Sequence, residues 1–151
     1  MGGDRMAIND IGQYWHGVVH HWVTLHPEYM PGWRFFRERH CYGEGKRAET
    51  HSNRAKPEID RVWDCANVGG CSGLWACHVA LMLGYTDILL AGVPMDNSGH
   101  FFDPPQYGSE HIDKAQDMVW RQSVANVFAG RVRSCSGRTR QWLQGGVGIA
   151  A

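Results

Sequence analysis

The sequence predicts an α/β protein with a mainly parallel, doubly wound sheet and helices on both faces of that sheet. Residues 74–83 are almost all apolar and are followed by Gly84, a pattern typical of a buried helix with a glycine stop. Residues 88–93 form an apolar run without alternating polar residues, which indicates a strand buried on both faces. With 151 residues, 43% of them hydrophobic, the chain is expected to form one domain over residues 1–145 and a flexible tail over 146–151.

The first half of the chain contains two further candidate strands. Residues 5–10 resemble a strand that ends at a polar Asn-Asp pair, and residues 18–25 form a second strand that ends before Pro27. Pro27 is expected to open a helix that runs toward His40. Residues 41–56 are almost free of apolar side chains and are interpreted as a mobile surface loop, after which residues 59–64 lead back into the sheet.

The second half continues the same alternation of elements. Residues 97–108 combine glycine and proline with His100, Phe101 and Phe102, which indicates a loop that acts as a lid. Ser109 is expected to cap a helix that ends at Gly130. A short strand over residues 131–135 and a helix over residues 137–143 complete the prediction.

The start of the central helix is a candidate anion site. Ser72 stands at the N-cap position, and Gly70 and Gly73 leave the nearby backbone amides uncovered. The helix dipole favours a phosphate or carboxylate there by ~0.3–1 kcal/mol. The alternative is a turn that only allows the helix to pack closely on the sheet, since the segment contains neither a dinucleotide fingerprint nor a Walker sequence.

Polar residues follow three of the predicted strands. Ligands of open α/β sheets bind outside the carboxyl ends of the strands, so these residues are the candidate site. A histidine there has the pKa of a general base, and an aspartate can orient a ribose or a divalent ion. The candidate catalytic residues are His100, His26 and Asp96, and the candidate ligand-binding residues are Asn9, Asp10, Gly70, Ser72, Gly73 and Asn97.

Charge and hydropathy exclude several classes of function. The net charge is zero, so a nucleic-acid partner is not expected. The sequence has neither an apolar run of ~20 residues nor a secretory leader, so we expect a cytoplasmic protein without a membrane partner, in the host cytoplasm if a phage encodes it. Composition leaves the oligomeric state open, and a homo-oligomer is compatible with it.

Cysteine and histidine spacing predicts no metal site. The five cysteines are odd in number and include no Cys-x-x-Cys pair, so neither a disulfide framework nor a zinc site is expected. Cys71, next to a helix start, is the candidate for a reactive thiol. A metal site built from four histidines of the first strands is disfavoured because their spacing places them on both faces of a strand. These histidines are His16, His20, His21 and His26.

The segment Ser-Gly-Leu-Trp-Ala at 72–76, with Ala-Leu-Met-Leu-Gly-Tyr at 80–85 and Ile-Leu-Leu-Ala-Gly-Val-Pro-Met-Asp at 88–96, resembles a segment of small bacterial sialyltransferases. It is also similar to Rossmann-like proteins related to archaeal pterin diphosphokinases. The short segments at 7–10, 21–28, 100–103 and 132–140 make the chain look closer still to Rossmann-like proteins carried by phages and prophages. The resemblance covers most of the chain, is dense over 68–103, and implies a trimmed Rossmann-like fold.

In the sialyltransferases a cytidine nucleotide-sugar lies across the carboxyl ends of the strands. The resemblance implies that Asn9 matches their ligand-binding asparagine, that Ser72 and Gly73 match their Ser-Gly turn, and that His100, or His111 in its place, matches their general base. The first strand and its glycine-rich loop have no counterpart in this sequence. We therefore expect either a fragment or a trimmed fold.

Two functions follow from these observations. The first is a nucleotide- or nucleotide-sugar-dependent transferase of the glycosyltransferase kind, whose ligand is a small nucleotide donor. The alternative is a non-catalytic protein that binds a nucleotide or a partner, and the missing phosphate loop favours this alternative.

Overall fold

The computed structural model describes residues 3–40, 47–65, 68–96 and 114–144. The described residues divide into two compact units, one within the ranges 1–66 and 70–79 and the other within the ranges 67–69 and 80–151. The helix α3 (Ser72–Met82) contributes to both units. The expectation of one domain over residues 1–145 stays a prediction.

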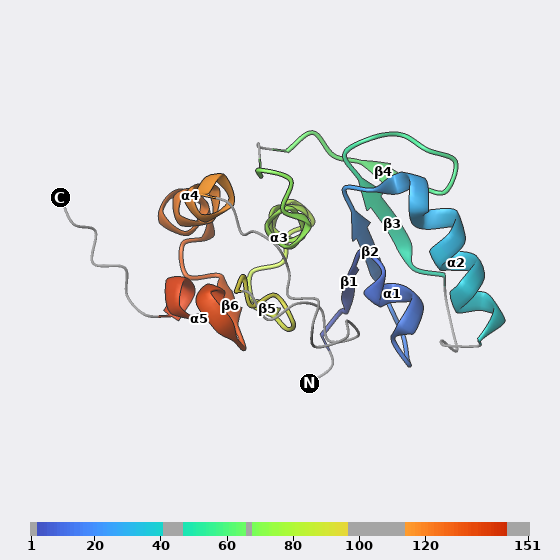
Figure 1. Cartoon of the computed structure of the whole chain (residues 1–151), viewed down its shortest axis with the longest axis horizontal. Coiled ribbons are helices and arrows are strands. Elements are labelled where there is room, and N and C mark those ends of the chain that lie inside the picture. The colour runs from blue at the N-terminus through green and yellow to red at the C-terminus, as the bar shows by residue number, and fades with distance from the viewer. Residues whose placement is uncertain (1–2, 41–46, 66–67, 97–113, 145–151) are drawn as a thin grey trace. The chain divides into compact units, whose positions relative to one another are not determined.

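The first unit is built on a four-stranded parallel sheet, which confirms the predicted α/β class. Its strands are β1 (Met6–Ile8), β2 (His21–Thr24), β3 (Glu49–Ser52) and β4 (Arg61–Val62), in the spatial order β1-β2-β3-β4 (Figure 1). In the register of the pairs, Ala7 is opposite Trp22, and Trp22 is opposite Thr50. Side chains alternate along a strand, so these three residues share one face of the sheet.

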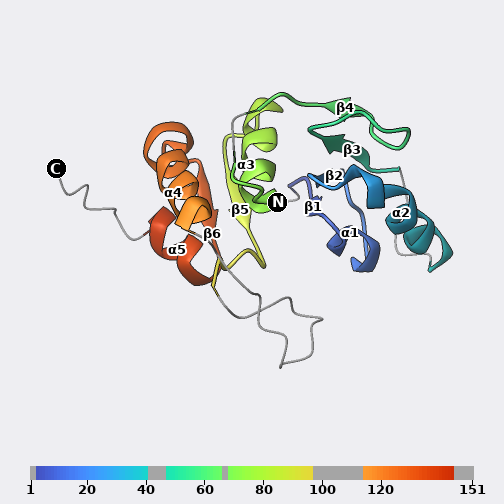
Figure 2. The same ribbon diagram turned by 45° about the horizontal axis from the view of Figure 1, so that its top comes forward.

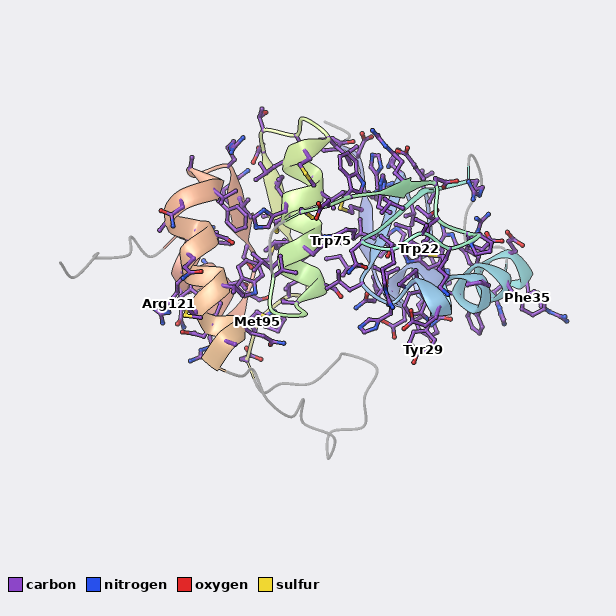
Figure 3. The ribbon with its side chains drawn as sticks, turned by 90° about the horizontal axis from the view of Figure 1, so that it is seen from above. Trp22, Tyr29, Phe35, Trp75, Met95 and Arg121 are labelled. Atoms are coloured by element: carbon purple, nitrogen blue, oxygen red, sulfur yellow. The ribbon has the colours of Figure 1, made fainter. Side chains whose placement is uncertain are left out.

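Two helices cover this face. The helices α1 (Ile11–Tyr14) and α2 (Met30–Arg39) follow β1 and β2, and a 3-10 turn, η1 (Pro27–Tyr29), opens α2 as Pro27 predicts (Figure 1). Trp22 is fully buried between the sheet and the helices, whereas Phe35 lies on the exposed outer side of α2 (Figure 3). The core of the unit consists of Ala7, Val19, Trp22 and Met30, against which Ile11, Trp33, Ala48 and Ile59 pack.

The strand β3 corrects the prediction of a surface loop over residues 41–56. Thr50, His51 and Ser52 are buried, although none of them is apolar. The backbone of β3 is paired on both sides, with β2 and with β4, so its polar peptide groups are satisfied inside the unit. Its polar side chains also form hydrogen bonds. For example, the hydroxyl of Thr50 donates to the carboxylate of Asp60 across 2.7 Å. The loop prediction was therefore wrong for residues 49–52.

The helix α3 agrees with the buried helix expected from the apolar run. Every residue from Cys71 to Ala80 is buried. The helix ends before Gly84, which has the left-handed backbone conformation (φ 94°) of a glycine stop.

The second unit contains a parallel pair of strands, β5 (Ile88–Leu90) and β6 (Val132–Ser134). The helix α4 (Lys114–Ser123) continues into a π-helical turn (Val124–Phe128), and α5 (Gly137–Gln144) follows β6 (Figure 2). Trp120 of α4 lies against Phe128 and against Trp142 of α5, with ring centroids 6.2 and 6.1 Å apart. These aromatic contacts hold α4 and α5 together.

The strand β5 is not buried on both faces as predicted. Leu90 is buried, but Leu89 is 60% exposed. Neighbouring residues of a strand point to opposite faces, so β5 buries a single face, and its apolar composition gave no sign of this.

Candidate functional site

The carboxyl end of β1 is fixed to β2 by Asn9. Asn9 adopts the left-handed backbone conformation (φ 53°), which asparagine tolerates better than most residues. Its amide N–H donates to the carbonyl of Val23 (2.9 Å), and its own carbonyl accepts from the indole N–H of Trp22 (2.6 Å). Its side-chain oxygen accepts from the hydroxyl of Thr24 (2.9 Å). In the described residues the side-chain NH2 group of Asn9 has no partner, so this group remains available as a donor.

The hydroxyl of Thr24 connects Asn9 to His26. The backbone N–H of His26 donates to Oγ1 of Thr24 across 2.8 Å. The half-exposed imidazole of His26 places Nδ1 3.7 Å from Oε1 of Glu28. The guanidinium of Arg54, which follows β3, donates to the other oxygen of Glu28 (3.0 Å) and to the carbonyl of Leu25 (3.2 Å).

These contacts define the carboxyl-edge cluster, which consists of Asn9, Thr24, His26, Glu28 and Arg54. The pKa of Glu28 is lowered, mainly by a hydrogen bond from its own backbone N–H, which outweighs the opposing effect of burial, and further by the nearby Arg54 and His26. Glu28 is therefore a carboxylate at neutral pH, and it orients both His26 and Arg54.

The structure brings together only part of the predicted site. Asn9 and His26 meet through Thr24, and Asp10 follows Asn9 at the start of α1, where its side chain makes no capping hydrogen bond. Ser72 and Gly73 are buried, whereas Gly70 is exposed with a left-handed backbone (φ 75°). Asp96 belongs to the second unit. The remaining predicted residues, Asn97, His100 and His111, and the lid over residues 97–108, lie outside the described residues.

A second group of chemically active side chains lies at the amino ends of β2 and β3. His21 is paired with Glu49 in the register of these strands, and His51 is two residues beyond Glu49. All three side chains therefore lie on the sheet face opposite Trp22. Nδ1 of His21 lies 3.0 Å from Nε2 of His51, and Oε2 of Glu49 lies 3.5 and 3.7 Å from these two nitrogens. We call this group the histidine–glutamate cluster.

Two residues of β4 and its extension surround this cluster. The indole N–H of Trp63 donates to Nδ1 of His51 across 3.0 Å. The guanidinium of Arg61 lies 3.7 Å from Oε1 of Glu49 and 4.6 Å from the centre of the Trp63 ring. Burial, helped by repulsion from His21 and Arg61, lowers the pKa of His51 to about 4, and burial also lowers the pKa of His21. Both imidazoles are therefore neutral at pH 7 and above.

The sequence interpretation missed this cluster. It assigned Glu49 and His51 to a loop, so their spacing of two residues, which places both on one face of a strand, was not used. The four histidines considered for a metal site do not gather. His20 accepts from the backbone N–H of Arg5, His26 lies beside Glu28, and His21 alone joins the cluster.

The described cysteines, Cys65, Cys71, Cys77 and Cys135, form no disulfide with one another. Cys71, the candidate reactive thiol, is buried just before α3. The described helices include none with the length and apolar character needed to cross a membrane.

Comparison of the chain with protein-family models, with curated proteins and with solved structures finds no match. The resemblance to sialyltransferases and to phage-encoded Rossmann-like proteins therefore stays an expectation from the sequence.

Proposed function

We propose that the protein is a nucleotide- or nucleotide-sugar-dependent transferase of the glycosyltransferase kind, with a Rossmann-like fold, which acts at the carboxyl-edge cluster. The observation that carries the proposal is the connection of Asn9, Thr24 and His26 at the carboxyl ends of neighbouring parallel strands. This edge is where open α/β sheets bind their ligands. Parallel pairing in both sheets supports the Rossmann-like fold.

Each member of the cluster has a chemical role in this proposal. The side-chain NH2 group of Asn9 donates to the ribose or base of the nucleotide. The exposed guanidinium of Arg54 neutralises a phosphate. His26 removes the proton from an acceptor hydroxyl, whose oxygen bonds to the transferred sugar carbon as the bond from that carbon to the phosphate oxygen breaks. Glu28 stabilises the imidazolium that results.

The start of α3 belongs to the same unit as the carboxyl-edge cluster. His100 as an alternative base and Asp96 as a group that orients a ribose stay predictions from the sequence. The phosphate site expected at the start of α3 rests on the exposed backbone of Gly70, since Ser72 and Gly73 are buried.

Calorimetric titration with a panel of nucleotides and nucleotide-sugars tests the proposal. We expect one nucleotide to bind, Asn9→Ala to weaken its binding about tenfold, and His26→Ala to retain binding but abolish the transfer product detected by mass spectrometry. His20→Ala is the matched control, since His20 is a partly exposed histidine of the same strand region outside the cluster. Failure of every nucleotide to bind would refute the proposal.

The alternative function, a non-catalytic protein that binds a nucleotide or a partner, is distinguished by the same experiment. Tight nucleotide binding without turnover in the wild-type protein, unchanged by His26→Ala, favours this alternative.

A further inference from the structure

We infer that the histidine–glutamate cluster is a binding site for a first-row divalent metal ion of the zinc class. The ligands are Nδ1 of His21, Nε2 of His51 and Oε2 of Glu49, and the three distances between these atoms are 3.0, 3.5 and 3.7 Å. In a tetrahedral zinc site with bonds of ~2.0–2.1 Å, two ligand atoms lie about 3.3–3.4 Å apart. The three atoms therefore form nearly one face of such a tetrahedron.

The strands hold these ligands in place. His21 and Glu49 are opposite each other on paired strands, and Glu49 and His51 lie on the same face of β3. His51 is fully buried, so its ring is held firmly by its neighbours. Ligands carried by rigid strands need little reorganisation when a metal binds.

The composition and the exposure of the cluster also fit a metal. Two histidines and one glutamate are the protein ligands of several zinc enzymes, in which the fourth position binds water or substrate. Glu49 is partly exposed, with 38% of its side-chain surface accessible, whereas the histidine side chains are 14% and 0% accessible. Solvent therefore reaches the cluster from the side of Glu49, where the fourth ligand would bind.

Arg61 leaves one oxygen of Glu49 for the metal. The guanidinium lies 3.7 Å from Oε1, and Oε2 faces the imidazoles. A partner on the second oxygen is the usual way in which proteins orient a carboxylate ligand. The positive charge of Arg61 also reduces the attraction for a cation, so we expect moderate rather than extreme affinity.

Trp63 opposes metal binding in this arrangement. Its indole N–H donates to Nδ1 of His51, so the neutral imidazole carries its proton on Nε2, the atom that must bind the metal. In the metal-bound state that proton resides on Nδ1, and the hydrogen bond from Trp63 is lost. The net proton count does not change. Removing the indole N–H is therefore expected to tighten metal binding.

The test uses the full-length protein after treatment with a chelator. Zn²⁺ affinity is measured by competition with a chromophoric chelator, and Co²⁺ is added separately because its visible spectrum reports the coordination geometry. We expect one site per chain with the intense visible bands of tetrahedral Co²⁺ and no thiolate charge-transfer band. His21→Ala and Glu49→Gln should each weaken binding at least tenfold.

Matched controls identify the ligands. His20→Ala removes the neighbouring histidine and Glu38→Gln removes an exposed glutamate of α2, and both should leave the affinity unchanged. Trp63→Phe should tighten binding about five- to tenfold, which corresponds to one hydrogen bond. Circular dichroism of each variant shows that it is folded, and the fully buried His51 is left intact for this reason.

Three results would overturn the inference. They are the absence of a site that binds one metal ion per chain in the wild-type protein, binding that His21→Ala and Glu49→Gln leave unchanged, and binding that occurs only in Trp63→Phe. The metal site does not depend on the proposed transferase function. Nucleotide titrations and metal titrations therefore test separate statements.

Discussion

The indole N–H of Trp63 donates to Nδ1 of His51 across 3.0 Å, twelve positions back along the chain on the neighbouring strand. Because His51 is fully buried with its pKa lowered to about 4, its imidazole is neutral and has a single proton. That proton resides on Nε2 and points to Nδ1 of His21, 3.0 Å away. The contact thus sets the direction of hydrogen bonding from Trp63 through His51 to His21.

The first prediction concerns this tautomer. Long-range ¹⁵N–¹H correlation spectra of the metal-free protein above pH 7 should show the proton of His51 on Nε2. His40 is an internal comparison, because its Nδ1 lies 2.8 Å from the carbonyl of Phe36 and must donate to it. In Trp63→Phe the preference of His51 for the Nε2 tautomer should weaken. A proton on Nδ1 of His51 in the wild-type protein would contradict the prediction.

The second prediction compares two glycines of the first unit. A Cβ on Gly12 would collide with the indole of Trp22, which is fully buried and has no space to move. Gly12→Ala should therefore destabilise the protein by about 2–4 kcal/mol. Gly32 lies in α2 with nothing within 4 Å of an added Cβ, so Gly32→Ala should stabilise by about 0.5–1 kcal/mol.

Urea denaturation of both alanine variants measures these changes, and the opposite signs make the pair its own control. Equal destabilisation by the two substitutions would show that the packing of α1 on Trp22 is not the cause.

The local sequence pattern was sufficient to predict the strands and helices that bury apolar side chains. The alternation in residues 18–25 predicted β2, and the continuous apolar run predicted α3. The strand β3 could not be found in this way, because its buried side chains are polar. They are satisfied by residues distant in sequence, such as Asp60 for Thr50 and Trp63 for His51. Propensity and periodicity do not include such tertiary partners.

The need for tertiary partners also explains why one candidate site was predicted from the sequence and the other was not. Asn9 and His26 were predicted because each follows a recognisable strand, and the carboxyl ends of parallel strands meet at one edge. The histidine–glutamate cluster was not predicted, because two of its three residues belong to the unrecognised strand β3. Knowledge of the strand register, which pairs His21 with Glu49, is what makes this cluster visible.

The third prediction concerns Thr139 in the second unit. Thr139 is fully buried, and its hydroxyl donates to the carbonyl of Val93 (2.6 Å) and lies 2.8 Å from the hydroxyl of Ser134. Thr139→Val keeps the shape but leaves these polar groups without their partner, so it should destabilise by about 1–3 kcal/mol. Thr139→Ser keeps the hydroxyl and should lose less. Thermal unfolding measures both, and equal losses would contradict a role for the hydroxyl.

The fourth prediction is an acid-dependent loss of stability caused by Asp60. Burial alone would raise the pKa of Asp60, but hydrogen bonds from Arg47 and from the backbone and hydroxyl of Thr50 outweigh it and lower the pKa to about 2. The unfolded chain binds a proton on this carboxylate near pH 3.8. Between these values the unfolded state binds more protons, so the stabilisation by Asp60 is complete above about pH 5 and is lost as the pH falls toward 2.

Asp60→Asn removes the negative charge and replaces one accepting oxygen by an NH2 group. This group cannot accept the hydrogen bonds that Arg47 and Thr50 donate to Asp60. At neutral pH it should destabilise the protein by about 1–3 kcal/mol, because hydrogen bonds to a charged group are lost. The difference in free energy of unfolding between wild type and variant should stay constant from pH 7 to 5 and shrink from pH 4 to 2, as urea denaturation at each pH would show. Asp87→Asn is the matched control: Asp87 pairs with Arg133 at the exposed surface, so its substitution should change stability little at any pH. A difference for Asp60→Asn that is independent of pH down to 2 would show that the carboxylate of Asp60 is not what joins β3 to the segment that leads into β4.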